Sequence, residues 1–329
     1  MTEKKSDAQT GASLQPTTDH WPGPAGMIPV TSGRADDANV HNRNFLDHLL
    51  VEMRLIDAVK PDLTTTIFGK KYTSPLTLAA VSHLNQVLAD DHRQPMQEKA
   101  RAAKQLGVLN WVGMEDDPTF TNIAQQGAAT VWIIKPFADH QRILREIQVA
   151  ADQGAVAVGI DIDHVPGADG GYDVVDGLPM GPLTASDLQS YVHSTKLPFI
   201  AKGVLSVQDA VKAQNAGCRG IVVSHHHGRV PFGMPPLKIL PDILRTVNRH
   251  QMTVFVDGSL MSGYDAYKAL ALGADAVLIG RGILKELLDG GQDAVVEKVQ
   301  GMNQELSRLM LYTGVKDTKS FDPTVIHYQ

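Results

Sequence analysis

The densest cluster of chemically versatile side chains in the sequence is Ser224–Arg229, which reads S-H-H-H-G-R. An imidazole can act as a general base near neutral pH, and an arginine binds a carboxylate through two parallel hydrogen bonds. Because successive residues leaving a strand point in opposite directions, we expect His226 to point away from His225 and His227. We interpret His226 as a candidate base and Arg229 as a candidate carboxylate ligand. A metal site that includes nearby aspartates, or a simple polar rim loop, are the alternatives.

Two short loops carry a second signal. One reads D-G-S from Asp257, and the other reads G-R-G from Gly280. Small residues leave backbone N–H groups accessible, and the guanidinium of Arg281 is a planar, permanently charged donor for phosphate oxygens. The loops therefore predict a phosphate site formed by Gly258, Ser259, Gly280 and Arg281, unless the glycines only make tight turns.

Several other polar residues directly follow apolar runs. Lys202 can form a Schiff base, pair with an acid or contact an anionic cofactor, and spacing does not choose among these roles. Asp161 and Asp163 lie on one side of an extended segment, either as paired acids or as acceptors for loop amides. The candidates for lining a substrate pocket are His83, Met114, Lys135, Asp161, Asp163 and His227.

Eight short apolar runs must position these side chains. Each is apolar on both faces, as expected of strands covered by helices, and segments with helical periodicity separate them. Eight β/α units in series predict a TIM barrel, an α/β fold whose active site forms at the carboxyl ends of the strands. The alternative, a doubly wound sheet, lacks its G-x-G-x-x-G motif here. The predicted strands are Leu76–Val81, Val108–Val112, Val131–Ile134, Ala155–Ile160, Phe199–Ala201, Gly220–Val223, Val254–Val256 and Ala276–Ile279.

Capping residues mark the predicted helices. Asp139 and Ser206 are expected N-caps, Ser262 or Gly263 is expected to open a third helix, and a glycine ends each of the three helices. A long C-terminal helix is expected from about Ala294 to Leu311, outside the ring.

Composition bounds the class of protein. The chain has 329 residues, a formal net charge of −6 and 43% hydrophobic residues, which excludes a disordered or fibrous chain and argues against a nucleic-acid binder. No apolar run is long enough to span a membrane, and residues 1–20 lack the apolar core of a signal peptide. The single cysteine, Cys218, excludes an intrachain disulfide and fits a cytoplasmic protein. We expect a loosely packed polar arm over residues 1–38 and a single barrel domain over residues 39–329.

Four segments follow one another in a characteristic order: A-K-G-V-L-S-V-Q-D-A (201–210), G-C-R-G-I-V-V-S-H-H-H-G-R (217–229), V-F-V-D-G-S (254–259) and K-A-L-A-L-G-A-D-A-V-L-I-G-R (268–281). Together they resemble the FMN-dependent α-hydroxy acid oxidase and dehydrogenase family, which includes glycolate oxidase and lactate oxidase. Shorter similarities, H-N-R-N-F (41–45) and F-G-K-K-Y-T-S-P-L-T-L-A-A (68–80), extend the resemblance over roughly residues 40–315.

The resemblance implies FMN as cofactor and assigns roles to residues already named. Lys202 would stabilise the anionic reduced flavin, His226 would take a proton from the substrate, and Arg229 would bind the substrate carboxylate. The residues expected to hold FMN are Ala79, Ala80, Lys202, Ser224, Asp257, Gly258, Ser259, Gly280 and Arg281.

The sequence departs from the family around the substrate. S-H-H-H-G-R replaces S-N-H-G-G-R, and I-I-K-P (133–136) replaces F-Q-L-Y. Ile134 and Pro136 are therefore predicted to replace a flavin-contacting Gln and a substrate-contacting Tyr. The segment G-I-D-I-D-H-V-P-G-A-D-G-G-Y-D (159–173) lacks the family's second substrate arginine, and Met261 replaces an arginine of the phosphate loop. We expect a substrate other than glycolate or lactate.

The leading hypothesis is an oxidoreductase that converts a 2-hydroxy acid or related carboxylated alcohol to the 2-oxo product, without a metal. Oxygen or another acceptor would reoxidise the flavin. The alternatives are a redox-neutral FMN-dependent isomerase resembling the type 2 isopentenyl diphosphate isomerases, a metal-dependent aldolase or hydrolase without flavin, and a flavin-binding protein with a decayed site. The expected partner is a small carboxylated molecule rather than a nucleic acid or a membrane, and the resemblance implies a homotetramer or larger assembly.

Overall fold

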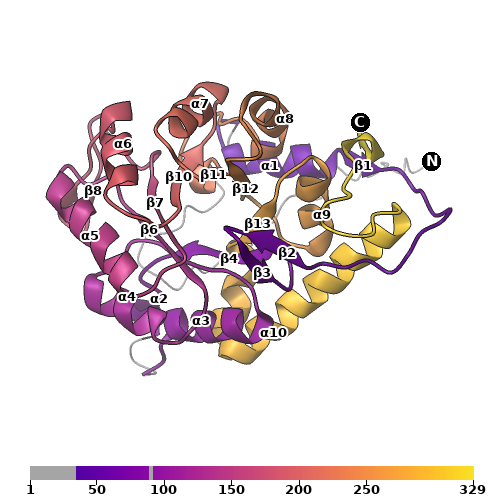
Figure 1. Cartoon of the computed structure of the whole chain (residues 1–329), viewed down its shortest axis with the longest axis horizontal. Coiled ribbons are helices and arrows are strands. Elements are labelled where there is room, and N and C mark those ends of the chain that lie inside the picture. Colours follow the sequence, from indigo (N-terminus) through magenta and orange to yellow (C-terminus); the bar gives the residue numbers. More distant parts are fainter. Residues whose placement is uncertain (1–34, 89–91) are drawn as a thin grey trace, which may run out of the picture.

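The computed structural model describes residues 35–88 and 92–329, and its centre is a closed barrel of parallel strands (Figure 1). The strands are hydrogen-bonded in the order β10-β11-β12-β13-β4-β5-β6-β7, and β7 pairs with β10 to close the ring. This order confirms the predicted TIM barrel. The strands are β4 (Leu76–Val81), β5 (Asn110–Val112), β6 (Thr130–Ile134), β7 (Ala157–Asp161), β10 (Phe199–Val204), β11 (Gly220–Val223), β12 (Thr253–Val256) and β13 (Ala276–Ile279).

A ring of helices surrounds the barrel, as Figure 1 shows. In chain order the helices are α1 (Ala38–Asp47), α2 (Leu84–Val87), α3 (Pro95–Leu106), α4 (Asp117–Ala124), α5 (His140–Asp152), α6 (Ala185–His193), α7 (Val207–Asn215), α8 (Pro236–Thr246), α9 (Gly263–Ala271) and α10 (Arg281–Tyr312). The predicted N-caps are confirmed: Asp139, Ser206 and Ser262 each accept a hydrogen bond from the first turn of α5, α7 and α9.

Two hydrophobic clusters explain why the strands are apolar without alternation. Side chains that point into the barrel, such as Trp111, Ile133 and Phe255, form an inner cluster. Side chains on the opposite strand face pack against the helices in a larger outer cluster. Both faces of each strand are therefore removed from water, which removes any need for polar residues along it.

A hairpin that sequence analysis did not predict covers the amino-terminal end of the barrel. It consists of β2 (Thr65–Ile67) and β3 (Lys70–Tyr72), joined through Phe68 and Gly69, which both have positive φ. The Phe68 ring lies 6.0 Å from Phe255 in the inner cluster. Since this end of the barrel is covered, the carboxyl end is left for a site.

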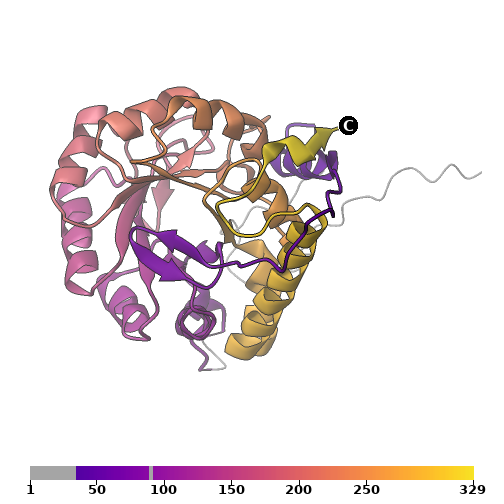
Figure 2. The ribbon, with the colours of Figure 1, turned by 45° about the vertical axis from the view of Figure 1, so that its right-hand side comes forward.

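The C-terminal strand pairs with a short strand that follows α1. β1 (Leu49–Val51) pairs antiparallel with β14 (Ile326–Tyr328). Helix α10 starts at Arg281, earlier than predicted, and is kinked at Gly291, where φ is 67°. Figure 2 shows α10 along one side of the ring. The predicted arm over residues 1–38 lies almost entirely outside the described residues. No described helix is long and apolar enough to cross a membrane.

Candidate active site

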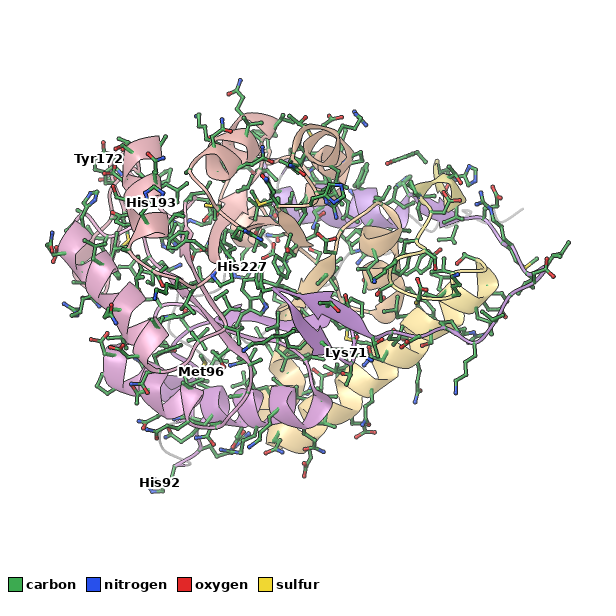
Figure 3. All side chains as sticks on the ribbon, in the orientation of Figure 1. Lys71, His92, Met96, Tyr172, His193 and His227 are labelled. Atoms are coloured by element: carbon green, nitrogen blue, oxygen red, sulfur yellow. The ribbon has the colours of Figure 1, made fainter. Side chains whose placement is uncertain are left out.

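The ends of the barrel strands and the loops that follow them line a pocket at the carboxyl end of the barrel. His227, labelled in Figure 3, is one of its lining residues. Nearly all residues predicted to hold the cofactor line it as well. The lining residues are Ala79, Ala80, Val81, Lys202, His227, Asp257, Gly258, Ser259, Leu260, Met261, Leu278, Gly280 and Arg281.

One end of this cavity has the features of a phosphate site. The Arg281 guanidinium donates to the Ser259 hydroxyl at 3.2 Å, and Arg281 is the first residue of α10. The N-cap of α10 is Gly280, which offers no side-chain acceptor, so the first N–H groups of the helix are available to an anion. Gly258 has a φ of 105°, and a Cβ there would lie 3.0 Å from Asn42 Nδ2. The geometry therefore favours glycine at position 258.

Helix α1 contributes Asn39, which sequence analysis missed, and Arg43, which it had noted only as part of a short motif. Asn39 accepts a hydrogen bond from Arg281 at 2.8 Å and donates to the His227 carbonyl at 2.8 Å. Arg43 donates to the Ser259 carbonyl at 3.1 Å. The motif H-N-R-N-F, which places polar side chains along a helix, was the sequence signal for Arg43. No local feature of the sequence shows that this helix reaches the mouth of the barrel.

The residues present fit FMN. Arg281 and the open N-terminus of α10 suit a phosphate, the Asp257 carboxylate suits hydroxyl groups, and the small Ala79 and Ala80 leave room for a flat ring. Asn42 Nδ2 and His225 Nε2 are buried without a partner among the described residues, and both lie near Gly258. Unused polar atoms at such a position are a feature of ligand sites.

Ser224, the remaining predicted cofactor residue, lies just behind the cavity. Its hydroxyl accepts a hydrogen bond from the His226 amide at 3.0 Å and is hydrogen-bonded to Asp257. It therefore joins the ends of β11 and β12.

Two buried lysines share one carboxylate at the other end of the cavity. Lys202 donates to Asp161 Oδ1 at 2.9 Å, and Lys135 donates to Asp161 Oδ2 at 2.7 Å. Burial alone would raise the pKa of Asp161, but the two ammonium groups lower it well below its usual value. Burial favours a lower pKa for Lys202, yet Asp161 and Asp257 raise it overall. The carboxylate and the Lys202 ammonium are thus both charged at neutral pH.

His226 forms a hydrogen-bonded pair with Asp163. The His226 Nδ1 atom lies 2.9 Å from Asp163 Oδ1, and it is 3.8 Å from Asp161 Oδ1. Because a carboxylate oxygen only accepts, Nδ1 carries the proton and Nε2 carries the lone pair. Burial and the Lys202 charge lower the pKa of His226 well below its usual value. The ring is therefore neutral at pH 7 and has a free basic nitrogen.

A backbone irregularity makes room for this pair. The pairing of β10 with β11 shifts register between Lys202 and Val204, and the intervening Gly203 has a φ of 90°. A Cβ at Gly203 would lie 2.2 Å from the Asp163 carboxyl carbon. Only glycine leaves space for Asp163 beside His226.

The predicted alternation of the three histidines is wrong. His226 and His227 have φ values of 45° and 60°, so the chain has already left the strand conformation. Their ring centroids lie only 5.3 Å apart, on one side of the loop. His225 is separate and buried, and its Nδ1 accepts from the Gly228 amide at 2.9 Å. Strand alternation does not extend into a tight turn.

Arg229 contacts a carboxylate of the protein itself. Its Nη2 donates to Asp173 Oδ2 at 2.7 Å, and His164 Nε2 lies 3.1 Å from the same oxygen. Asp173 stands in the loop after β7, next to a small hairpin of β8 (Val174–Val175) and β9 (Leu178–Pro179). The His164 Nδ1 atom accepts from Lys135 at 2.9 Å, since a lysine ammonium only donates. Burial lowers the pKa of His164 to about 3.

The structure brings most of the other predicted pocket residues together, but not all. His83 Nε2 lies 3.3 Å from Asp176 Oδ2 in the β8–β9 hairpin. Met114 instead packs in the outer hydrophobic cluster. Ile134 also packs there, whereas Ile133 belongs to the inner cluster and Lys135 reaches Asp161. Ile134, predicted to take the place of a flavin-contacting Gln, thus packs on the outer face of β6, whereas Ile133 packs inside the barrel. The prediction that Pro136 takes the place of a substrate-contacting Tyr stays a prediction.

One group of described residues has the spacing of metal ligands: Asp161, His164 and His226. Both oxygens of Asp161 already accept hydrogen bonds from lysine ammonium groups. These two positive charges oppose a cation at the same place.

Fold and site together define a TIM-barrel protein whose cavity suits a phosphate-bearing cofactor, with Lys202 on its lining and the His226–Asp163 pair nearby. The sequence matches the family described as FMN-dependent dehydrogenase over residues 25–182 and 168–328, and the chain belongs to this family. L-lactate oxidase from Nostoc sp. is 36% identical over 170 residues, which are 51% of this chain and 46% of that protein. The 4-hydroxymandelate oxidase of Amycolatopsis orientalis is 29% identical over 322 residues, 87% of this chain and 88% of that protein.

A crystal structure of mandelate oxidase has the same fold. Its TM-score is 0.79 at 26% sequence identity, and the similarity covers 90% of this chain and 91% of that chain. The predicted family is thereby confirmed: this is an FMN-dependent oxidoreductase of the α-hydroxy acid oxidase and dehydrogenase family, and FMN is its cofactor. The flavin-free aldolase or hydrolase alternative is therefore wrong, and the comparisons do not favour the isomerase.

Proposed function

We propose that this chain oxidises a 2-hydroxy acid to the 2-oxo acid, with His226 as base, Arg229 as carboxylate ligand and Lys202 at the flavin. The observation that carries the proposal is the His226–Asp163 pair. It places a neutral imidazole with a free Nε2 next to the Lys202–Asp161 pair, and Lys202 lines the cavity. This oxidation needs a base that takes a proton from the substrate and a cation that stabilises negative charge on the reduced flavin.

Bound FMN supplies the acceptor for the two electrons that leave the substrate. His226 Nε2 takes the substrate proton, from either the hydroxyl group or the α-carbon. Asp163 holds the imidazole by Nδ1 and stabilises the positive charge that forms on it. Arg229 orients the substrate through its carboxylate. The named oxidases among the relatives support oxygen as the electron acceptor.

The variant His226→Ala tests the role of the base. We expect it to retain the flavin spectrum but to lose anaerobic bleaching by a panel of 2-hydroxy acids, by about 10²- to 10⁴-fold in rate. His193→Ala, which removes an exposed histidine at the end of α6, is the matched control. Full reduction of His226→Ala at the normal rate would exclude His226 as base. If no acid bleaches the unaltered protein, the oxidation itself is the wrong reaction.

We also propose that residues 39–329 act as one FMN-binding domain in a homo-oligomer. Exposed apolar side chains at one edge support association; they include Met53, Ile56, Leu311 and Tyr312. Light scattering of the purified protein measures the number of subunits, and a monomer would contradict the proposal. The cytoplasmic location stays a prediction.

A further inference from the structure

Lys202, the lysine predicted to contact the flavin, pairs with Asp161, and Asp161 also pairs with Lys135. The side chains of Lys135, Lys202 and Asp161 are 8%, 5% and 3% exposed, so water screens their charges little. Lys202 lines the cavity, whereas Asp161 and Lys135 stand behind it, in contact with Lys202 and with each other. Neither residue touches the cavity, and each acts on it through Lys202.

The charges of this triad largely cancel. Lys202 and Asp161 alone form a neutral pair, because their nitrogen and oxygen lie 2.9 Å apart. Lys135 on the other oxygen of Asp161, at 2.7 Å, returns the group to a net charge of +1. His226 is neutral and does not add to this sum. The carboxyl groups of Asp163 and Asp257 also act on Lys202, but they are the same whether or not Lys135 is present. Lys135, which does not line the cavity, therefore contributes one unit of positive charge behind the flavin edge.

We propose that Lys135 and Asp161 are positioning residues that set the reduction potential of the flavin through Lys202. This inference rests on the proposed function, since it uses Lys202 at the flavin edge. Reduction of a flavin at neutral pH places negative charge on its N1 side. A net positive group there favours the reduced form, and a neutral group does not.

The triad leads to opposite expectations for a single and a double variant. Lys135→Met leaves the neutral Lys202–Asp161 pair and is expected to favour oxidised FMN by at least tenfold, which is about 30 mV for a two-electron couple. Lys135→Met combined with Asp161→Asn leaves Lys202 alone, with the original charge of +1. The double variant is therefore expected to return close to the potential of the unaltered protein.

The experiment is equilibrium reduction of the holoprotein against a reference dye, which needs no substrate. Lys135→Arg keeps the charge and is expected to behave like the unaltered protein. Lys135→Gln repeats the charge removal with a polar side chain, in case Lys135→Met folds poorly. Glu146→Gln alters another buried side chain, which pairs with Arg142 on α5 away from the cavity, and is the control for general damage.

An unchanged potential in both Lys135→Met and Lys135→Gln would overturn the proposal. A double variant whose reduction potential stays as low as that of Lys135→Met would also overturn the proposal. Lys135→Met would then lower the potential through structural damage, which a second substitution does not reverse. Potentials that follow the expected pattern while no 2-hydroxy acid reduces the flavin would leave this inference standing and remove the proposed function.

Discussion

The Arg229 guanidinium, the predicted ligand of the substrate carboxylate, donates a 2.7 Å hydrogen bond to the carboxylate of Asp173. The same carboxylate oxygen lies 3.1 Å from His164 Nε2, and the other oxygen accepts from the Val174 amide at 2.9 Å. An internal carboxylate thus occupies a position suited to a substrate carboxylate. We therefore expect Asp173 to compete with a substrate carboxylate for Arg229.

Replacing Asp173 by Asn is expected to tighten the binding of small carboxylates. The amide competes less well for Arg229 because hydrogen bonds between charged groups are worth about 1.5–3 kcal/mol, and 1.4 kcal/mol corresponds to tenfold in affinity. We expect about a tenfold lower Kd for oxalate, measured from its perturbation of the flavin spectrum. Asp169→Asn, in the same loop, is the control. Weaker oxalate binding in Asp173→Asn would show that Asp173 positions Arg229 rather than competes for it.

Gly203→Ala is expected to impair catalysis while FMN stays bound. The added Cβ would lie 2.2 Å from the Asp163 carboxyl carbon, so Asp163 must move away from His226. A displacement of about 1 Å in a catalytic group costs on the order of 10²-fold in rate. Stopped-flow reduction of the flavin measures the effect. Gly301→Ala has nothing within 4 Å of the new Cβ and should behave normally. Unimpaired reduction in Gly203→Ala would mean that the His226–Asp163 pair is dispensable.

The rate of flavin reduction is expected to fall as the pH drops below about 6. Burial raises the pKa of Asp163 to about 6, while the pKa of His226 is held well below its usual value. On acidification Asp163 therefore takes up a proton first and no longer stabilises the imidazolium that forms on His226. A pH profile of kcat/KM measures this fall on the acidic side. Asp163→Asn should reduce the flavin more slowly at pH 7 and should show no fall below pH 6. If kcat/KM of this variant still falls below pH 6, another group is responsible.

Lys99 is expected to make stability depend on pH above neutrality. This fully buried lysine donates to the carbonyls of Ala79 and Trp111 at 3.1 and 2.5 Å and to the Asn110 side chain at 2.7 Å. Burial lowers its pKa from 10.5 to about 7. Between these values the unfolded chain binds more protons than the folded one, so this contribution to stability rises with pH.

Thermal unfolding of Lys99→Met at pH 7 and pH 9 tests this expectation. The variant loses the hydrogen bonds beneath Ala79, worth about 1–3 kcal/mol, and it loses the rise with pH. The difference in Tm between the unaltered protein and Lys99→Met should therefore grow from pH 7 to pH 9. Lys104→Met, on the exposed side of α3, should show neither effect. A difference that shrinks with pH would contradict a depressed pKa.

The sequence by itself determined the barrel and the composition of its mouth. Strands covered on both faces must be apolar throughout, so eight such runs in alternation with capped helices leave little choice of fold. The polar residues that follow each run must then reach one rim. Lys202, His226, Asp257 and Arg281 were found in this way, because strand ends are local features and the fold collects them.

Only the tertiary structure decided which of these groups contact one another. Asp161 reaches Lys135 and Lys202, which lie 26 and 41 residues away, and Asp163 reaches His226 over 63 residues. These pairs depend on the register of neighbouring strands and on the bulge at Gly203, which no single segment specifies. The contact of Arg229 with Asp173 depends on the path of a loop. Long-range geometry therefore chose the partners of side chains whose local sequence had already brought them to the rim.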